Sequence, residues 1–472
     1  MSTGQPQIGG RIRRLRRLRS LSQAQLAEAL EISASYLNLI EHNRRPVTVP
    51  LLFRIAGYFG VEPGELAESD DGRLAGDLME LFGDDIFADL DLTNHDIREF
   101  ATSSPAVGRA VLKLFDRVRA LERAPSGPEP LTPGSDPLAP VAPSEAVSDF
   151  LQENANHFPA LEAVAERLAP DIERAGDGVE AGLRTCLFNV FGVEIRAASL
   201  PAGLAARREA DGRVLAVSDT LEPETALFVA ARQLARLAGA REIAALIEAS
   251  SIPEPAHGLA ADALGAYLAA AILMPYEPFL AACRDTRYDI ERIARRFRTS
   301  FEQVCHRMTT LQRPGLSGIP LHLVRTDIAG NISKRFSLSG IHIPRHSGAC
   351  PRWNIYAAFL NPGQINVQLS QMPDDKRYFC IARALTKGGH RYHAPRRHLS
   401  IGLGCEIVHA HRMVYADGVD LDAPGGATPI GVGCRICPRL ECAQRAHPAA
   451  DHRIGGDPDR YMENLYMRAE KR

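Results

Sequence analysis

Residues 21–41 read LSQAQLAEALEISASYLNLIE, and this stretch predicts two short helices joined by a tight turn at residues 31–33. In the first helix, Leu26, Ala27 and Leu30 recur on one face. In the second, Leu37 and Ile40 do the same. Because apolar residues three to four positions apart share one face of a helix, both segments have one side suited to a common core. The rest of the chain is interpreted outward from this pair.

Two serines are placed to begin these helices. Ser22 has Gln25 three residues later, which matches the capping box, and Ser33 stands at the N-cap position of the second helix. With Leu37 and Ile40 turned inward, the second helix presents its other residues to solvent. The residues expected to point outward are Ser35, Tyr36 and Asn38.

Two helices of this length and spacing are typical of a helix-turn-helix DNA reader, whose second helix lies in the major groove. Asn can bond adenine with two hydrogen bonds, Ser suits several bases, and flanking polar groups hold phosphates. The predicted DNA-contacting residues are Gln23, Ser33, Ser35, Tyr36, Asn38, Asn43 and Arg45. The alternative is a small helical module with a solvated basic face.

Charge along the first hundred residues supports DNA binding. Residues 1–60 carry nine arginines and three glutamates, whereas residues 61–100 carry thirteen acidic residues and two arginines. A basic module followed by an acidic one favours a polyanionic partner for the first alone. One reader makes few contacts, so we expect a homodimer or higher oligomer on a palindromic promoter operator in double-stranded DNA. The helical pattern at 71–124 suits dimerisation and a solvated spacer equally well.

Length and composition limit the class of protein. A chain of 472 residues exceeds one core, and 45% hydrophobic with 24% charged residues is ordinary for globular domains. The arginine-rich N-terminus lacks a secretory pattern, and no apolar run reaches the roughly 20 residues that span a bilayer. We therefore expect a cytoplasmic protein with no membrane partner. Nine cysteines, an odd number, argue against a disulfide framework there.

Composition also predicts the domain order. The expected parts are a DNA-binding domain at 8–67, a helical segment at 68–124, a proline-rich linker at 125–145, a mostly helical domain at 146–315 and an α+β sensor-like domain at 316–472. In the fourth part, helices are expected at 149–168, 222–237 and 259–273, with a short strand at 213–217. In the fifth, strands are expected at 321–325, 377–382 and 398–402.

The segment FVAARQLARL, residues 228–237, has the texture of a zinc-peptidase helix without its ligands. In His-Glu-x-x-His enzymes two imidazoles bind zinc and the glutamate is the base. Here those positions hold Arg232, Gln233 and Arg236, and arginine, always protonated, cannot ligate zinc. Together with residues 259–275, where Asp262 is the only carboxylate, this part resembles an ImmA/IrrE metallopeptidase domain. Those substitutions argue against an active zinc peptidase; the simpler alternative is a surface helix bearing arginines.

Three cysteines crowd together at Cys434, Cys437 and Cys442, a spacing typical of a metal or cluster site. His447 would complete a Cys3His zinc site, whereas Cys405, flanked by glycines, would complete a four-thiolate set. Cys350 and Cys380 are substitutes for the fourth position. Free, reduced thiols are the remaining alternative.

Taken together, the chain resembles the short-chain fatty-acyl-CoA transcriptional regulators from end to end. The motifs that carry the resemblance are SYLN at 35–38, AYLAAAILMP at 266–275, TLQRPG at 310–315, GNISKR at 330–335, CPRWN at 350–354, YHAPRR at 392–397 and CRICPRLECAQRA at 434–446. The resemblance implies a multidomain, mostly α protein with an Xre/Cro-like N-terminal bundle, a degenerate ImmA/IrrE-like centre and a C-terminal α+β sensor domain. It also implies a 4Fe–4S cluster, with Cys405 as its fourth ligand and zinc as the alternative.

The resemblance further implies that coenzyme A or a short-chain acyl-CoA, such as propionyl-CoA or acetyl-CoA, is the effector. Phosphates of coenzyme A need fixed cations, and arginine forks suit phosphate oxygens. The predicted ligand-binding residues are Arg232, Tyr267, Arg307, Arg313, Lys334 and Arg335. For each, the alternative is a solvated or structural side chain. The expected function is a non-enzymatic ligand-controlled switch on genes of short-chain fatty acid assimilation; an iron–sulfur redox regulator is the alternative.

Overall fold

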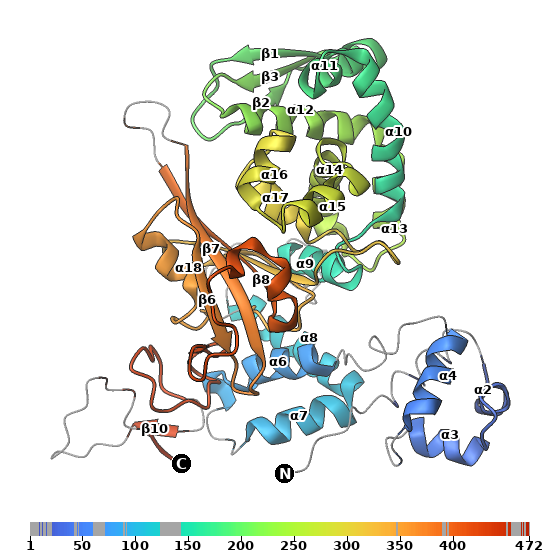
Figure 1. Ribbon diagram of the computed structural model, residues 1–472, viewed down its shortest axis with the longest axis vertical. Helices are drawn as coiled ribbons and strands as arrows, with labels where there is room; N and C mark the ends of the chain where they lie inside the picture. Colours follow the sequence, from blue (N-terminus) through green and yellow to red (C-terminus); the bar gives the residue numbers. More distant parts are fainter. Residues whose placement is uncertain are drawn as a thin grey trace, which may run out of the picture. The chain divides into compact units, whose positions relative to one another are not determined.

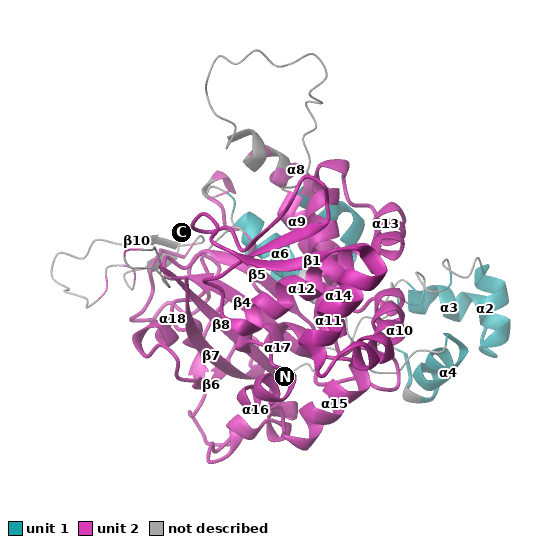
Figure 2. Ribbon diagram, turned by 90° about the horizontal axis from the view of Figure 1, so that it is seen from above, with its two compact units in different colours: residues 1–82, 89–112 teal, residues 83–88, 113–472 magenta. Residues whose placement is uncertain are grey.

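The computed structural model describes residues 9, 12, 16, 21–41, 45, 47–59, 71–87, 90, 92–122, 143–345, 348–388, 393, 396–449, 452–454, 464, 466 and 469–471. They form two compact units, residues 1–82 with 89–112 and residues 83–88 with 113–472 (Figure 2). Each unit is described by itself. Most of the expected linker, 125–145, lies outside the described residues, and helix α9 begins at Pro143.

In the first unit, helices α2 (Gln23–Ala29), α3 (Ala34–Glu41) and α4 (Val49–Phe59) enclose a small core. The predicted inner residues of both leading helices are buried in it, and Ile55 and Phe59 of α4 close it. The capping box of Ser22 and Gln25 is present in full, which confirms the predicted start of α2. Glu31 adopts a positive φ of 53° in the turn between the two helices.

Four helical elements lie within the described residues of 68–124, where the sequence predicts a helical segment. They are α6 (Asp71–Phe82), η1 (Asp85–Phe87), α7 (Asn94–Ser103) and α8 (Pro105–Glu122). Leu78 of α6 packs against Ile97 and Ala101 of α7 in a second small core. Thr93 and Asp96 form a capping box at the start of α7, which fixes where that helix begins.

In the second unit, which also contains residues 83–88 and the end of α8, the chain continues with helices α9 (Pro143–Glu153), α10 (Pro159–Ala175) and α11 (Val179–Phe191). The prediction of one helix over 149–168 is wrong, because the chain breaks between α9 and α10. Ala155 and Asn156 adopt positive φ values of 49° and 51° at that break, which no α-helix accommodates. Pro159 then opens α10 at its first position, where a missing N–H costs nothing.

A three-stranded sheet and six helices complete the central part. Strands β1 (Glu194–Ala198), β2 (Ala206–Arg208) and β3 (Val214–Ser218) lie in the order β1-β3-β2, and β3 is the strand predicted at 213–217. The helices are α12 (Pro223–Ala238), α13 (Ala240–Glu248), α14 (His257–Leu273, preceded by η2 at Glu254–Ala256), α15 (Tyr276–Asp285), α16 (Ile290–Phe297) and α17 (Phe301–Met308). Two of them, α12 and α14, correspond to predicted helices.

A six-stranded sheet forms the C-terminal part, in the order β5-β4-β8-β7-β6-β9. Figure 1 labels three of its strands, β6, β7 and β8. Its strands are β4 (Leu321–Asp327), β5 (Ile332–Ser337), β6 (Asn366–Gln371), β7 (Arg377–Gly388), β8 (Arg396–Glu406) and β9 (Thr428–Pro429). All neighbours pair antiparallel except β6 and β9. The three predicted strands are present as β4, β7 and β8.

Short elements decorate this sheet. They are α18 (Asn354–Ala357), η3 (Ala358–Leu360), η4 (Ile407–Arg412), η5 (Val414–Ala416) and the separate hairpin of β10 (His452–Ile454) and β11 (Ala469–Lys471). Each face of the sheet buries a different core. Phe379 faces the core shared with the central helices, whereas its neighbour Cys380 faces a core closed by Trp353 and Ile355.

The central helices and the C-terminal sheet share one continuous hydrophobic core, which crosses the boundary expected at 315–316. Leu268 of α14, Val304 of α17 and Leu403 of β8 all belong to it. Glu254–Leu273 is long and apolar enough to cross a membrane by length and composition alone. Most of that stretch is buried, because α14 is the central helix of this core. Its apolar character is therefore explained by packing.

Candidate functional site

The surface of α3 has the arrangement that the sequence predicts, with one exception. Ser35 and Asn38 are exposed, whereas Tyr36 is half-buried against the core of the reader. Ser33 accepts a hydrogen bond from the Tyr36 N–H at 3.1 Å, so it caps α3. Arg45 is exposed in the segment after α3, and Asn43 lies outside the described residues.

A buried ion pair fixes the base of this surface. Arg16 donates to both carboxylate oxygens of Glu41 at 2.6 and 2.9 Å, and the hydrogen bond to that carboxylate raises the pKa of Arg16. Gln23 Nε2 donates to Glu41 at 2.7 Å and to Asn38 Oδ1 at 3.2 Å. Gln23 therefore links α2 to α3 and orients the exposed amide of Asn38, which the sequence predicts to lie in the major groove.

In the central part, an ion pair stands where a peptidase would hold its metal. Arg232 on α12 donates to Asp262 on α14 at 3.3 Å. Gln233 is buried and Arg236 is exposed. The first of the two arginines thus pairs with Asp262, the one carboxylate of residues 259–275. This geometry provides a charge-balanced pair in place of an electrophilic metal and a general base.

Beside this pair, a cavity of about 1380 Å³ opens between the central helices and the C-terminal sheet. Its volume exceeds the several hundred cubic ångströms of most small-molecule sites. Five of the six predicted ligand-binding residues line it: Arg232, Tyr267, Arg307, Lys334 and Arg335. Arg313 is not among the lining residues.

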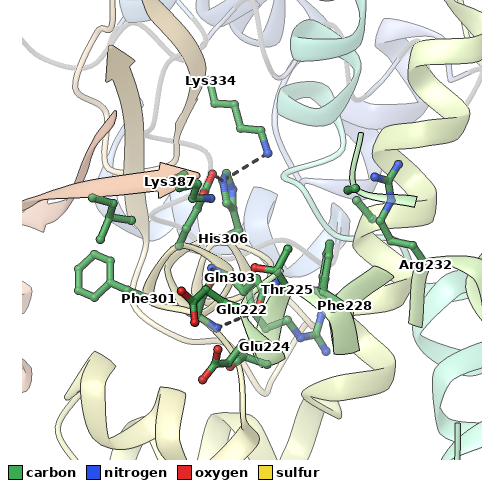
Figure 3. Close-up of a pocket in the computed structure, with 18 of the residues that line it drawn as sticks. Glu222, Glu224, Thr225, Phe228, Arg232, Phe301, Gln303, His306, Lys334 and Lys387 are labelled. Carbon is green, nitrogen blue, oxygen red and sulfur yellow. Dashed lines mark hydrogen bonds and ion pairs between the residues drawn. The ribbon is translucent and has the colours of Figure 1, made fainter. Parts of the chain in front are cut away.

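One end of the cavity is rich in basic side chains. Lys334 on β5, Lys387 on β7 and His306 on α17 gather there, with the Lys334 ammonium 3.5 Å from His306 Nε2 (Figure 3). Burial, and next the nearby Lys334 charge, lower the pKa of His306 to about 4, so this imidazole is neutral near pH 7. Burial and the neighbouring cations Arg325 and Lys387 lower the pKa of Lys334 to about 8.

The carboxylate of Glu302 is the anion at this end. It is 6% exposed, accepts a hydrogen bond from Arg325 Nη1 at 2.8 Å, and also binds the Lys387 ammonium. Burial alone would raise the pKa of Glu302, but the hydrogen bond from His306 and the charge of Lys387 hold it well below its usual range. One carboxylate therefore faces the charges of Arg325, Lys387 and Lys334, which leaves a surplus of positive charge.

The opposite wall carries a stretch of apolar side chains beside the charged groups Glu222, Glu224, Arg232 and Asp262. The apolar side chains come from the loop before β2, from the loop before α12, from α12 and from α14: Leu200, Pro201, Leu204, Leu221, Leu227, Phe228, Ala263, Ala266 and Ala270. Figure 3 shows Phe228 and Arg232 on the side of the cavity away from Lys387. A ligand with an anionic end and an apolar end would match this division.

Three predicted ligand residues, Arg307, Tyr267 and Arg313, have structural partners instead. Arg307 is fully buried and donates to both oxygens of Glu162 at 2.6 and 2.9 Å, while Tyr267 donates to the same carboxylate at 2.5 Å. Arg313 pairs with Glu166 at 2.5 Å and stacks on Tyr276, with its guanidinium carbon 4.2 Å from the ring centre. These side chains already have partners that satisfy their charge.

Sequence reasoning missed three residues of the basic end: Glu302, His306 and Lys387. Glu302 and His306 are four residues apart on α17, so one helix face presents both, and that spacing is visible in the sequence. Lys387 stands near the end of β7, and its position depends on the pairing of β7 with β8. Only the long-range sheet register places it beside α17.

The cysteines do not gather as expected. Cys405 is fully buried on β8 in the main core, with its sulfur 3.9 Å from that of Met413. Burial, together with the nearby Cys434 and Cys437, raises the pKa of the Cys350 thiol, so Cys350 rather than Cys405 is the neighbour of that pair. Within the described ranges, no three His, Cys, Asp or Glu side chains are close enough to hold a metal ion.

A guanidinium organises the cysteine loop. Arg445 is 3% exposed and donates to the backbone carbonyls of Cys434, Cys437, Arg439 and His447 at 2.6–3.2 Å. The Ala446 N–H donates to the Cys434 sulfur at 3.3 Å. A buried cation and an N–H directed at sulfur both favour negative charge on the cysteines of this loop.

Family models match three consecutive parts of the chain. They are described as helix-turn-helix for residues 12–66, IrrE N-terminal-like domain for 188–309, and short-chain fatty acyl coenzyme A regulator, C-terminal, for 310–466. These matches follow the order of domains that the motifs predict.

Full-length relatives are similar over nearly the whole chain. RamB and PrpR, both called HTH-type transcriptional regulators, from Mycobacterium tuberculosis, are 38% identical over 468 residues, covering 98% of this chain and 98% and 96% of theirs. A propionyl-CoA carboxylase regulator of Cereibacter sphaeroides is 38% identical over 454 residues, 96% of each chain. A solved structure titled Mycobacterium tuberculosis transcriptional regulator matches with a TM-score of 0.65 and 39% identity, over 68% of this chain and 98% of that one.

Proposed function

The chain belongs to the short-chain fatty-acyl-CoA regulator family of DNA-binding transcriptional regulators, and from this premise we propose that a short-chain acyl-CoA, propionyl-CoA or acetyl-CoA, binds its cavity. Through that binding the protein controls genes of short-chain fatty acid assimilation in the cytoplasm. The observation that carries the proposal is the surplus of cations at one end of a cavity that has a stretch of apolar side chains on its other wall.

The chemistry of coenzyme A suits this division. Its phosphates carry several negative charges, and Lys334 has no carboxylate partner among the residues that the structure describes. Lys334 and Lys387 would bind phosphate, while the thioester arm would lie along Phe228 and the alanines of α14. Arg335 and Arg232 serve as the cavity's secondary cations, since Glu145 and Asp262 already pair with them.

Tyr267 and Arg307 would shape the wall of the cavity rather than bind the ligand. Their shared carboxylate, Glu162, balances the buried guanidinium, and Tyr267 is held between them. Arg313, outside the lining, has Glu166 as its partner. The proposed ligand-binding set is therefore narrower than the set that the sequence suggests.

The same cavity argues for a binding function in place of catalysis. Arg232 and Asp262 pair with each other where the metallopeptidases hold zinc. Neither a metal-bound water nor a general base can be assembled from Arg232, Gln233 and Arg236. We infer that the IrrE-like part has kept the fold and exchanged peptide hydrolysis for ligand binding.

Control of transcription would follow from coupling between cavity and reader. Ser35 and Asn38 would read bases, and Gln23 and Arg45 would fix phosphates of a palindromic operator bound by a dimer. Coupling requires only that the ligand bind one conformation better than another. The half-site spacing that two readers can match would then depend on ligand.

Isothermal titration with propionyl-CoA, acetyl-CoA and coenzyme A tests the effector. Saturable heat with an acyl-CoA, together with a changed affinity for promoter DNA in its presence, is the expected result. Butyrate and propionate as free acids are the controls, because they lack the phosphates. Absence of heat with every thioester would contradict the proposal and leave the DNA-reading function intact.

We also propose that the cysteine loop holds a thiolate-bound metal centre, either a 4Fe–4S cluster or zinc, with Cys350 taking the place expected for Cys405 beside Cys434, Cys437 and Cys442. Its support is the closeness of Cys350 to that loop and the buried Arg445, a cation without a carboxylate partner in the described part of the chain. Such a centre would supply negative charge to balance the guanidinium.

Metal analysis of protein purified without oxygen tests this second proposal. Cys350→Ser should lose bound iron or zinc, whereas Cys405→Ser should retain it, because Cys405 lies in the main core. Absorption near 400 nm with bound sulfide separates a cluster from zinc. Metal-free wild-type protein, or loss in the Cys405 variant alone, would contradict the assignment.

A further inference from the structure

Glu302 is the one buried acidic group at the cationic end of the cavity, among the residues that the structure describes there, and the proposed function gives it no role. It stands at the second position of α17, after the N-cap residue Ser300. A carboxylate in the first turn is stabilised by the helix dipole, so α17 favours its charged form before any partner is counted. Its partners, Arg325 and Lys387, come from β4 and β7 of the sheet.

The position of this carboxylate decides what it can do. Glu302 and Lys387 both line the cavity, whereas Arg325 does not. Lys387 therefore has one face toward Glu302 and another toward the space where an anionic ligand would lie. Its ammonium carries three N–H donors on a flexible stem, so it can exchange partners without movement of the backbone.

We propose that Glu302 competes with the ligand's phosphate for Lys387. Glu302 binds the Lys387 ammonium in the empty protein and releases it when a phosphate group enters the cavity. This inference rests on the proposed function, since it assumes an anionic effector in this cavity. The exchange removes one of the two ion pairs by which the start of α17 is tied to the sheet.

Charge balance supports the exchange. With His306 neutral, Glu302 stands against Arg325, Lys387 and Lys334, so the site lacks negative charge until a ligand brings it. When a phosphate takes Lys387 and Lys334, Glu302 keeps the half-buried Arg325 as its partner at 2.8 Å. The buried carboxylate of Glu302 is therefore paired in both states, which avoids the desolvation penalty of an unpaired buried charge.

The release of Lys387 would also pass the effect of ligand binding to neighbouring helices. α17 contacts β4, and α14 contacts α17, so a change at the first turn of α17 reaches the core helix of the central part. A ligand shifts an equilibrium only by its differential affinity for two states. Release of Lys387 is such a difference, because the ion pair exists in one state and is replaced in the other.

The test compares coenzyme A binding to four proteins by titration calorimetry: wild type, Glu302→Gln, Lys387→Met and the double variant. Removing the competing charge should tighten binding about tenfold, in line with the strength of one charge-assisted hydrogen bond. The gain should disappear in the Lys387→Met background, because no lysine is then released. Asp149→Asn is the matched control, since it weakens the ion pair with Arg345 outside the cavity.

Glu302→Gln leaves Arg325 without its carboxylate, so the variant's thermal unfolding is measured first. If it does not fold, hydrogen exchange on the wild-type protein decides: coenzyme A should speed amide exchange within residues 301–308. Two results would contradict the proposal that Glu302 competes for Lys387. One is an unchanged or weaker affinity for coenzyme A in a folded Glu302→Gln variant, and the other is slower amide exchange over residues 301–308 when coenzyme A binds the wild type. Absence of binding to the wild type would instead overturn the proposed effector.

Discussion

Two buried carboxylates near the cavity, Glu162 and Glu302, differ in how their charge is balanced. Glu162 meets one guanidinium, Arg307, in a bidentate pair, and Tyr267 completes its hydrogen bonds. Glu302 meets Arg325 and Lys387, with Lys334 close by. The first cluster is neutral and complete, whereas the second carries surplus positive charge beside open space. Charge balance, more than residue type, therefore distinguishes a structural ion pair from a binding site.

The largest expected effect concerns the balanced pair. Arg307→Ala should lower the free energy of unfolding by about 3–5 kcal/mol, because it leaves Glu162 buried without its counter-charge. Chemical denaturation measures this loss. Glu162→Gln combined with Arg307→Met should recover much of it, since neither charge then remains buried. A destabilisation below about 1 kcal/mol for Arg307→Ala would mean that the pair is not structural.

For the cluster around Glu302, which carries surplus positive charge, we expect the reverse: a large effect on ligand binding and a small effect on stability. Lys334→Ala should weaken coenzyme A binding about tenfold or more and change the free energy of unfolding little, because Lys334 has no carboxylate partner within the described ranges. Titration calorimetry and denaturation together give both numbers. Arg313→Ala is the matched control: it removes a cation near the cavity that is not among its lining residues, so affinity should remain unchanged.

The pH dependence of binding sharpens the same contrast. Lys334, with its pKa lowered to about 8, loses its charge between pH 7 and 9, so the affinity for coenzyme A should fall several-fold over that range. Bound phosphate favours the charged ammonium, so binding near pH 8 should take up protons, and this shows in calorimetry across buffers of different ionisation enthalpy. In Lys334→Met the fall should vanish. A flat profile in the wild type would contradict a phosphate at Lys334.

Much of the fold could be predicted because it depends on local signals. The capping residues Ser22 and Gln25, the apolar spacing of α12 and α14, and the alternation in β4 each act within one element. The break between α9 and α10 was missed because apolar spacing was given more weight than two local signals, Asn156, a residue that tolerates left-handed backbone, and Pro159. Apolar periodicity continues across it.

The candidate site was predictable only in part, for a different reason. Lys334 and Arg335 follow a turn motif and could be found from sequence. The roles of Arg307 and Cys405 could not, because burial and partners decide them, and both depend on long-range packing. A residue type shows what chemistry is available. Its neighbours show whether that chemistry is already used.

The smallest expected effect tests the same contrast in the helix-turn-helix domain. There Arg16 and Glu41 form a balanced, buried pair, whereas Arg45 is exposed after α3. Arg45→Ala should weaken binding to all DNA sequences only a few-fold and lower the slope of log affinity against log salt by about 1, as expected for one lost phosphate contact. Fluorescence anisotropy at several salt concentrations measures both quantities.

Asn38→Ala is the matched variant for that measurement. Asn38 is an exposed amide on α3, oriented by Gln23, so its loss should reduce discrimination among sequences and leave the salt slope unchanged. A changed slope in Asn38→Ala, or lost discrimination in Arg45→Ala, would reverse the assignment. The exposed arginine would then read bases and the amide would hold the backbone, and surplus charge would no longer mark the phosphate-binding residues in both halves of the molecule.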